Sequence, residues 1–442
     1  MIKPLLCIVL LLSSLPCQAL GLLDAYALAL RNDPTFQAAL SEHSAGQQAS
    51  IIVRAGLLPT LSYGYNSARN RSDVDAGTTR TERDYRSYNS QLSVQQPLFD
   101  YAAWVAWRQG VTRSLMADQR VRARSQELAA RLFSAFSQAL LSAEHVRLAQ
   151  ARSRAYGQQL LRNQHLFKAG EGTRTDTLET QARDSLAQAE ALEAQDTLEA
   201  AMQTLQAMLG ESLTVHDLAP LREDFNVPAQ APASFEHWRD LAMRHNPALA
   251  GQQHALDIAE QEIQRQRAGH LPTVALYAQS RTSRSDSENS YNQQHDTDTV
   301  GLRLHLPLYA GGSTAAATRQ AVAAHRQASF ELDASRSALL NQLREQFNRS
   351  VSSQARIRAL QLATASARLL IDATRDSVAG GERVNVDVLN AEQQHYSAQR
   401  DLAEARHAYL QAWLQLRVLS GQLQSSDLEQ LDRSFGTPQG EA

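Results

Sequence analysis

Apolar and polar residues alternate along four short segments of the chain, which is the pattern of a β-strand whose two faces meet different surroundings. In the first segment Leu61, Tyr63 and Tyr65 share one face, and in the last Val300 and Leu302 do the same. The polar runs inside each pair of segments, about residues 69–86 and 281–298, predict long loops. The sequence therefore predicts two hairpins, with strands at about residues 60–68, 88–98, 273–280 and 299–308.

A long stretch with helical character follows each hairpin. No proline lies between Pro97 and Pro220, and residues that favour helix dominate this stretch. Between Leu128 and Ala149 apolar or small residues recur about every 3.5 residues, the spacing of a coiled coil. A helix over about residues 102–167 would be about 100 Å long, far longer than a globular domain requires.

Glycines predict where this long helix turns back. Gly170 and Gly172 end it, and Thr173 or Thr175, together with Asp176, can cap a helix that returns to about residue 210. The first half of the chain therefore predicts a unit of helix, strand, strand, helix and helix.

The second half repeats this order of features. Matching pairs of segments lie about 210 residues apart: residues 32–34 and 245–247, 58–59 and 271–272, 97–99 and 307–309, and 170–176 and 381–387. The sequence predicts a first structural repeat over residues 20–219, a linker with prolines over 220–234, a second repeat over 235–424 and a C-terminal tail over 425–442.

The first 19 residues have the pattern of a secretory signal peptide. Lys3 precedes an apolar run over residues 5–15, and Ala19 stands at the cleavage position. An uncleaved anchor is the alternative, but the run is shorter than the roughly 20 residues of a spanning helix. A lipoprotein signal at Cys17 is another alternative, and Pro16 before that cysteine disfavours it.

The composition argues against several classes of function. The net charge is -3 and the charges have mixed sign along the chain, so we expect no nucleic-acid partner. Both cysteines, Cys7 and Cys17, lie in the predicted signal. The sequence lacks the zinc-protease, phosphate-loop and nucleophile-elbow motifs, and the histidines, among them His395 and His407, are scattered. We therefore expect no enzyme, no cofactor and no metal site, and histidines that are satisfied or solvated.

Four strands are too few to close a barrel in a membrane, since the smallest use about eight and an open edge is not tolerated in lipid. One face of the predicted strands is apolar and the other carries Ser, Asn, Gln, Arg and His, which suits lipid outside and water inside. Several chains would then share one barrel. The alternative is a soluble helical protein with two surface hairpins.

The repeated motifs resemble the TolC-like family of outer-membrane channel proteins over nearly the whole mature chain. The resemblance rests on Asn32-Asp33-Pro34, on the Leu-Pro before each first strand, and on residues 96–100 and 381–389. It implies a mainly α fold with a four-stranded β contribution. In a homotrimer these strands would form a twelve-stranded β-barrel, continued by a long periplasmic α-helical barrel.

Within that family, residues 21–26, 83–85 and 172–179 are most similar to the type I secretion branch that exports alkaline metalloproteases. The resemblance implies a passive exit duct in the cell outer membrane, extending into the periplasm. Its partners would be a periplasmic membrane-fusion adaptor, an inner-membrane ABC exporter, the exported protein and outer-membrane lipid. The outer-membrane channel of a proton-driven multidrug efflux pump is the alternative of the same architecture, and a periplasmic coiled-coil adaptor or scaffold is the alternative of another class.

The resemblance also implies a periplasmic gate at the turns between the long helices. Asp176, Arg383 and Asp387 match family positions there, with Arg383 bonding neighbouring helices and the aspartates lining the constriction. Asn390 and Val378 depart from the family pattern, which implies a weaker ring of charge and a simpler network. The alternative is that Asp176 and Asp387 are ordinary helix caps.

Overall fold

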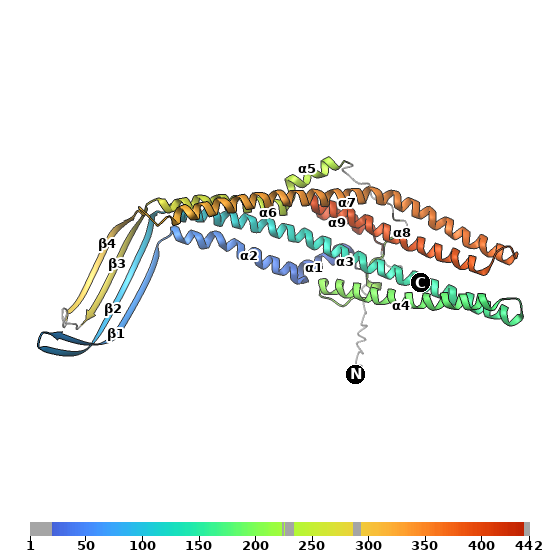
Figure 1. Ribbon diagram of the computed structural model, residues 1–442, viewed down its shortest axis with the longest axis horizontal. Helices are drawn as coiled ribbons and strands as arrows, with labels where there is room; N and C mark the ends of the chain where they lie inside the picture. Colours follow the sequence, from blue (N-terminus) through green and yellow to red (C-terminus); the bar gives the residue numbers. More distant parts are fainter. Residues whose placement is uncertain (1–19, 223–224, 226–233, 286–292, 437–442) are drawn as a thin grey trace, which may run out of the picture. The chain divides into compact units, whose positions relative to one another are not determined.

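The computed structural model describes residues 20–222, 225, 234–285 and 293–436 (Figure 1). The predicted signal peptide, most of the predicted linker and residues 437–442 at the end of the tail lie outside these ranges.

One order of elements occurs twice in the described chain. The first set is α1 (Leu22–Asn32), α2 (Pro34–Arg54), the 3-10 turn η1 (Ala55–Leu57), β1 (Thr60–Ala76), β2 (Thr79–Phe99), α3 (Tyr101–Ala169) and α4 (Arg174–Leu209), followed by η2 (Val215–Asp217). The second is α5 (Phe235–His245), α6 (Pro247–Arg267), η3 (Ala268–His270), β3 (Thr273–Ser285), β4 (Gln293–His305), α7 (Ser313–Ala379) and α8 (Asn385–Ser420), followed by α9 (Ser425–Asp432). The predicted long helices and their turns are confirmed.

The chain forms two compact units, and each combines stretches of both sequence halves. We call them the strand unit (Ala39–Arg122 and Pro247–Ala338) and the helical unit (Met1–Ala38, Ala123–Asn246 and Leu339–Ala442). The duplicated halves are therefore interleaved and do not form two separate globules.

The strand unit holds one antiparallel sheet in the order β1-β2-β3-β4 (Figure 1). The prediction of long loops is wrong, because β1 and β2 continue through the polar run to a turn at Gly77, whose φ is 67°. Charges pair across these two strands, with Arg71 contacting Glu82 and Arg80 lying 3.0 Å from Asp73. The strands persist there without apolar alternation because backbone pairing and opposite charges support them.

The other hairpin also differs from its predicted bounds. β3 reaches Ser285 and β4 begins at Gln293, so their strands are longer on the side of the turn than predicted. At its other end β4 stops at His305, short of the predicted residue 308. Pro307 follows closely, and a proline has no N–H to give to a neighbouring strand.

The register places the apolar residues of the four strands on one face, which we call the apolar face. Leu61 pairs with Val94, Val94 with Ala278, and Ala278 with Val300. Leu61 is 69% exposed and Val300 75% exposed. A soluble sheet would cover such a face, so this one needs an apolar surrounding.

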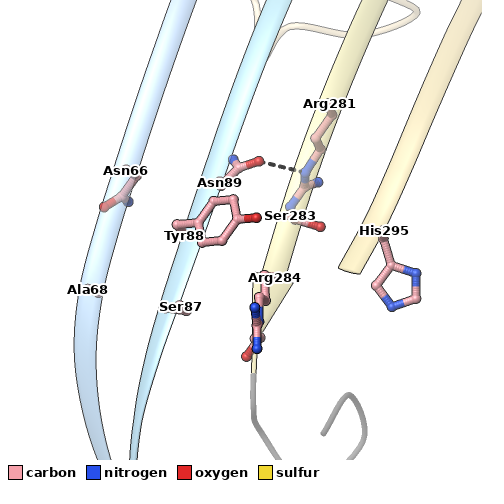
Figure 2. A pocket seen from close by; sticks show the side chains of 10 residues that line it. Asn66, Ala68, Ser87, Tyr88, Asn89, Arg281, Ser283, Arg284 and His295 are labelled. Carbon is pink, nitrogen blue, oxygen red and sulfur yellow. Dashed lines mark hydrogen bonds between the residues drawn. The ribbon is translucent and has the colours of Figure 1, made fainter. Parts of the chain in front are cut away.

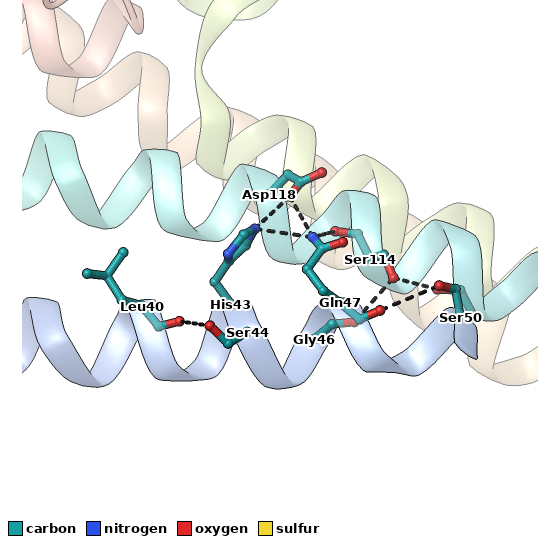
Figure 3. A network of polar contacts seen from close by, with 9 residues as sticks. Leu40, His43, Ser44, Gly46, Gln47, Ser50, Ser114 and Asp118 are labelled. Atoms are coloured by element: carbon teal, nitrogen blue, oxygen red, sulfur yellow. Dashed lines mark hydrogen bonds and ion pairs between the residues drawn. The ribbon is translucent and has the colours of Figure 1, made fainter. Parts of the chain in front are cut away.

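In the strand unit α2 and α3 approach closely through small residues and a polar network (Figure 3). A Cβ at Gly46 would lie 2.6 Å from the Cβ of Ala117, so only glycine fits there. Asp118 accepts a hydrogen bond from Gln47 at 2.7 Å, and the Nε2 of His43 lies 2.7 Å from the same carboxylate oxygen. These contacts fix the register of the two helices.

The core of the helical unit is built mainly from α1, α3, α4, α8 and α9, and Ile357 of α7 also belongs to it. Its largest fully buried side chains include Phe133, Phe136, Tyr409 and Trp413. The ring of Phe435 packs edge-on against Phe136 at 5.5 Å. The prediction of residues 425–442 as a tail is therefore wrong for α9 and Phe435, since apolar residues at helical spacing anchor this segment in the core.

His407 lies in the interior of the helical unit. Its Nδ1 is 2.7 Å from the hydroxyl of Ser137, so the side chain is satisfied, as predicted. Burial lowers the pKa of His407 to about 4, with smaller effects from Glu144, His145 and Arg406. The imidazole is therefore neutral in the folded protein and protonates more readily when the chain unfolds.

This difference predicts a loss of stability in acid. Between about pH 6.5 and pH 4 the unfolded chain binds a proton at His407 and the folded chain does not. Above this window His407 does not lower the free energy of unfolding, and as the pH falls through the window the free energy of unfolding drops by about 3 kcal/mol. The thermal unfolding midpoint of the purified protein, followed from pH 7 to pH 4, should depend less on pH in His407→Gln. The control His216→Gln, at an exposed histidine, should keep the slope of the original protein. An equal slope in all three proteins would contradict the assignment.

Candidate functional site

The turn after α3 and the turn after α7 end their helices in the same way. After α3, Gly170 has a φ of 77°, and the N–H groups of Glu171 and Gly172 both donate to the Leu166 carbonyl, at 2.9 and 3.1 Å. After α7, Gly381 also has a φ of 77°. A residue with a side chain is strained in that conformation, so the glycines make both tips possible.

The helices that begin after these turns are capped differently. Thr173 accepts a hydrogen bond from the backbone N–H of Asp176 at 3.0 Å, and its hydroxyl donates to the Asp176 carboxylate at 2.6 Å. Val384 stands at the equivalent position before α8 and makes no side-chain cap. Asp387, which corresponds to Asp176, has no side-chain hydrogen bond or ion pair with any residue that the structure describes. Capping therefore accounts for Asp176 and not for the carboxylate of Asp387.

Two of the three predicted gate residues line one pocket. Asp176 and Arg383 border a cavity of about 330 Å³ between the helix tips, and Asp387 does not. Arg383 is exposed and forms no hydrogen bond or ion pair within the described part of the chain. Its guanidinium is therefore available to a group that a single chain does not supply.

A buried polar chain connects the helices behind this pocket, and the sequence reasoning missed it. Thr180, which is fully buried, accepts hydrogen bonds from Asn163 at 2.8 Å and from Asn385 at 3.3 Å. Gln159 donates to the Asn385 side chain at 2.6 Å. We call these four residues the amide chain; it links α3 and α4 to the start of α8. Polar residues at inward positions of a helical repeat were the signal that could have identified it.

Further contacts lie next to the amide chain. The hydroxyl of Tyr156 lies 3.4 Å from the carbonyl oxygen of Leu389, and burial raises the pKa of this tyrosine. Arg375 lies 2.6 Å from Glu392, whose side chain is only 4% exposed. Arg183 donates to Asn390 at 3.1 Å, so this departure from the family pattern still supplies a contact between the hairpins.

A second pocket, of about 290 Å³, lies on the sheet of the strand unit (Figure 2). Its lining is polar and includes Asn66, Asn89, Arg281, Ser283 and His295. Arg281 donates from Nε to the Asn89 side chain at 2.9 Å.

The residues that the structure describes include no group of three or more His, Cys, Asp or Glu side chains placed to hold a metal ion. None of their helices combines the length and the apolar character that crossing a membrane requires.

Comparison with solved structures supports the fold. The outer-membrane protein VceC of Vibrio cholerae matches with a TM-score of 0.76 and 17% identity, covering 90% of this chain and 96% of VceC. At this identity the similarity concerns the fold alone.

Two relatives share about half of their residues with this chain. The alkaline protease secretion protein AprF of Pseudomonas aeruginosa is 50% identical over 421 residues, 94% of this chain and 88% of AprF. The proteases secretion protein PrtF of Dickeya chrysanthemi is 49% identical over 437 residues, 98% of this chain and 94% of PrtF. The family model described as outer membrane efflux protein matches residues 25–211 and 238–422, most of both sequence halves. The chain therefore belongs to the outer membrane efflux protein family, whose TolC-like architecture its motifs predict.

Proposed function

We propose that this protein is the outer-membrane exit duct of a type I secretion system and conducts an exported protease out of the cell. The observation that carries the proposal is the identity of about half of all residues with AprF and PrtF, both named for protease secretion, over nearly the whole chain. The protein lies in the outer membrane and reaches into the periplasm. It passes its cargo passively.

The partners follow from this role. An inner-membrane ABC exporter supplies the energy, and a periplasmic membrane-fusion adaptor joins the exporter to the duct. The exported protein passes through the duct, and outer-membrane lipid surrounds the apolar face of the sheet.

The role in protein export predicts a specific phenotype. Deleting the gene should abolish secretion of one or a few proteases and leave drug susceptibility nearly unchanged, because the duct serves one dedicated exporter. Protease activity in the culture medium and minimal inhibitory concentrations measure the two effects. The reverse pattern would identify the efflux channel of a multidrug pump.

The sheet supports assembly as a homotrimer. Within the chain β1 and β4 pair on one side only, so the described sheet has two free edges. Three copies in a ring would cover every edge and give a twelve-stranded barrel. The apolar face of each sheet would then meet lipid, and the opposite face would enclose water.

This assembly predicts that an added charge harms trimer formation on the apolar face and not on the opposite face. Leu302→Arg places a charge on the apolar face and should cost about 2–4 kcal/mol where that face crosses the middle of the bilayer, so the heat-sensitive trimer in outer-membrane fractions should fall severalfold. The control Thr299→Arg, on the other face of β4, should assemble normally. Light scattering that shows a monomer, or equal amounts of both variants, would rule the barrel out.

The helix tips support a role for Asp176, Arg383 and Asp387 as a periplasmic gate. Arg383 has a free guanidinium beside the pocket at the tips, and Asp387 has a carboxylate without a described partner. In a trimer Arg383 would bond a neighbouring helix, and three Asp387 carboxylates would line the narrow end. Asp176 would contribute mainly by fixing the start of α4.

Single-channel recording in planar bilayers tests this gate. Arg383→Ser removes charge-assisted bonds worth about 0.2–1 kcal/mol each at an exposed site, three times over, so the resting conductance should rise. Asp387→Ala should lower the preference for cations, because a carboxylate ring at a narrow aperture concentrates them.

The control for the gate is Thr173→Val, which gives α4 the uncapped start seen in α8. It should cost about 1 kcal/mol of local stability and leave ion preference unchanged, because no charge is lost. If Arg383→Ser conducts like the original protein and Asp387→Ala keeps its ion preference, the gate does not depend on these residues.

A further inference from the structure

The two faces of the sheet differ in charge as well as in polarity: one carries charges of both signs, and the charged side chains described on the other are all positive. Every carboxylate that the structure describes in the strands lies in register with the apolar face. Asp73, Glu82 and Asp84 lie beyond its apolar rows, and Asp296 and Asp298 lie on β4 in the rows of Tyr65 and Tyr63. Arginines accompany them, and Arg69, Arg71 and Arg80 contact acidic partners there. The charges on this side of the sheet therefore largely compensate one another.

The opposite face, which we call the polar face, carries no carboxylate among the described strand residues. Its charged groups are the arginines Arg83, Arg281 and Arg303, and it also holds His295 and His305. Most other positions of this face are Ser, Thr, Asn or Gln. This face is thus cationic and hydrogen-bonding, and none of its described side chains is negative and could balance the arginines.

Neutral groups hold two of these arginines in place. The Nε of Arg281 donates to the side-chain oxygen of Asn89 at 2.9 Å, across β3 and β2 (Figure 2). The guanidinium of Arg303 lies 5.0 Å from the centre of the Tyr277 ring. Such contacts position a guanidinium and leave its positive charge available.

Gly301 makes room for the Tyr277 ring on which Arg303 lies. A Cβ there would lie 2.8 Å from the Tyr277 hydroxyl, so the ring covers the glycine and reaches the neighbouring strand. None of Arg83, Arg281 and Arg303 forms an ion pair with a residue that the structure describes. The polar face therefore presents fixed, uncompensated positive charge.

We propose that the polar face is the contact surface for acidic stretches of the exported polypeptide in the lumen of the barrel. The proposal rests on the proposed function, since the polar face lines the lumen only if the chain forms the trimeric duct. Threefold symmetry repeats each arginine around the lumen, and rings of Arg or Lys favour anions in a pore. An acidic segment gains long-range attraction there, while the neutral Ser, Asn and Gln side chains offer only brief hydrogen bonds.

Weak contacts at many sites suit an exported polypeptide that must keep moving through the pore. A passing chain has to be attracted strongly enough to enter and held weakly enough to leave. Exposed arginines meet this requirement, because water screens each contact with a carboxylate. An apolar lining would instead retain a partly unfolded chain.

Channel block by charged peptides tests the proposal. Oligo-aspartate and oligo-lysine of equal length are added to the compartment that the barrel mouth faces, and block of single trimers is measured in planar bilayers. Oligo-aspartate should block the original protein at about tenfold lower concentration than oligo-lysine. The double variant Arg281→Gln with Arg303→Gln should lose most of this preference.

A matched pair of variants separates the polar face from charge in general. Arg281→Gln and Arg86→Gln each remove one positive charge from neighbouring strands, and only Arg281 is on the polar face. The first should weaken block by oligo-aspartate severalfold, and the second should leave it unchanged.

Equal block by both peptides, an unaffected double variant, or equal effects of Arg281→Gln and Arg86→Gln would each overturn the proposal. Other measurements show whether the proposed function itself is wrong. A chain that forms no duct would give no channels at all, and an efflux channel would give channels but would show the reverse deletion phenotype, with drug susceptibility changed and protease secretion kept.

Discussion

Backbone hydrogen bonding at the edges of the sheet is the constraint on which the other features depend. β1 and β4 leave one side unpaired within the chain, beside an apolar face that water would disfavour. In lipid each unpaired N–H or C=O costs several kcal/mol, so such a sheet can exist there only as part of a closed ring. The proposed assembly of several copies would meet this requirement in the outer membrane, and it would enclose the polar face at the same time.

The sequence predicted those parts of the fold in which a local residue pattern is compatible with only one local structure. Glycines such as Gly170 and Gly381 marked the turns of the long helices, because a positive φ is strained for other residues. Apolar alternation located the middles of the strands and not their ends. Beyond the apolar rows β1 and β2 are held by backbone pairing and by contacts such as Arg71 with Glu82, which leave no periodic signal. The packing of Phe435 was also missed, since only the folded core supplies its partners.

The sequence located the candidate site but not the contacts of its side chains, because those contacts form only in the folded protein. The family resemblance at the helix turns identified Asp176, Arg383 and Asp387, but it could not show that Asp176 is engaged in a cap while Asp387 is not. That difference comes from the exchange of Thr173 for Val384 and is visible only when the two starts are compared in structure. The two tips are therefore similar in backbone and differ in how their side chains are engaged.

The amide chain at Thr180 has a consequence for the range of media in which the protein can work. Gln159, Asn163, Thr180 and Asn385 carry no net charge, and their hydrogen bonds are largely shielded from solvent. Dissolved ions weaken attraction between exposed charges, with a Debye length that falls from about 30 Å at 0.01 M to about 3 Å at 1 M, and they have little effect on buried neutral dipoles. The joint between α4 and α8 should therefore hold equally well in fresh water and in brine, while the exposed ion pairs around it weaken as salinity rises.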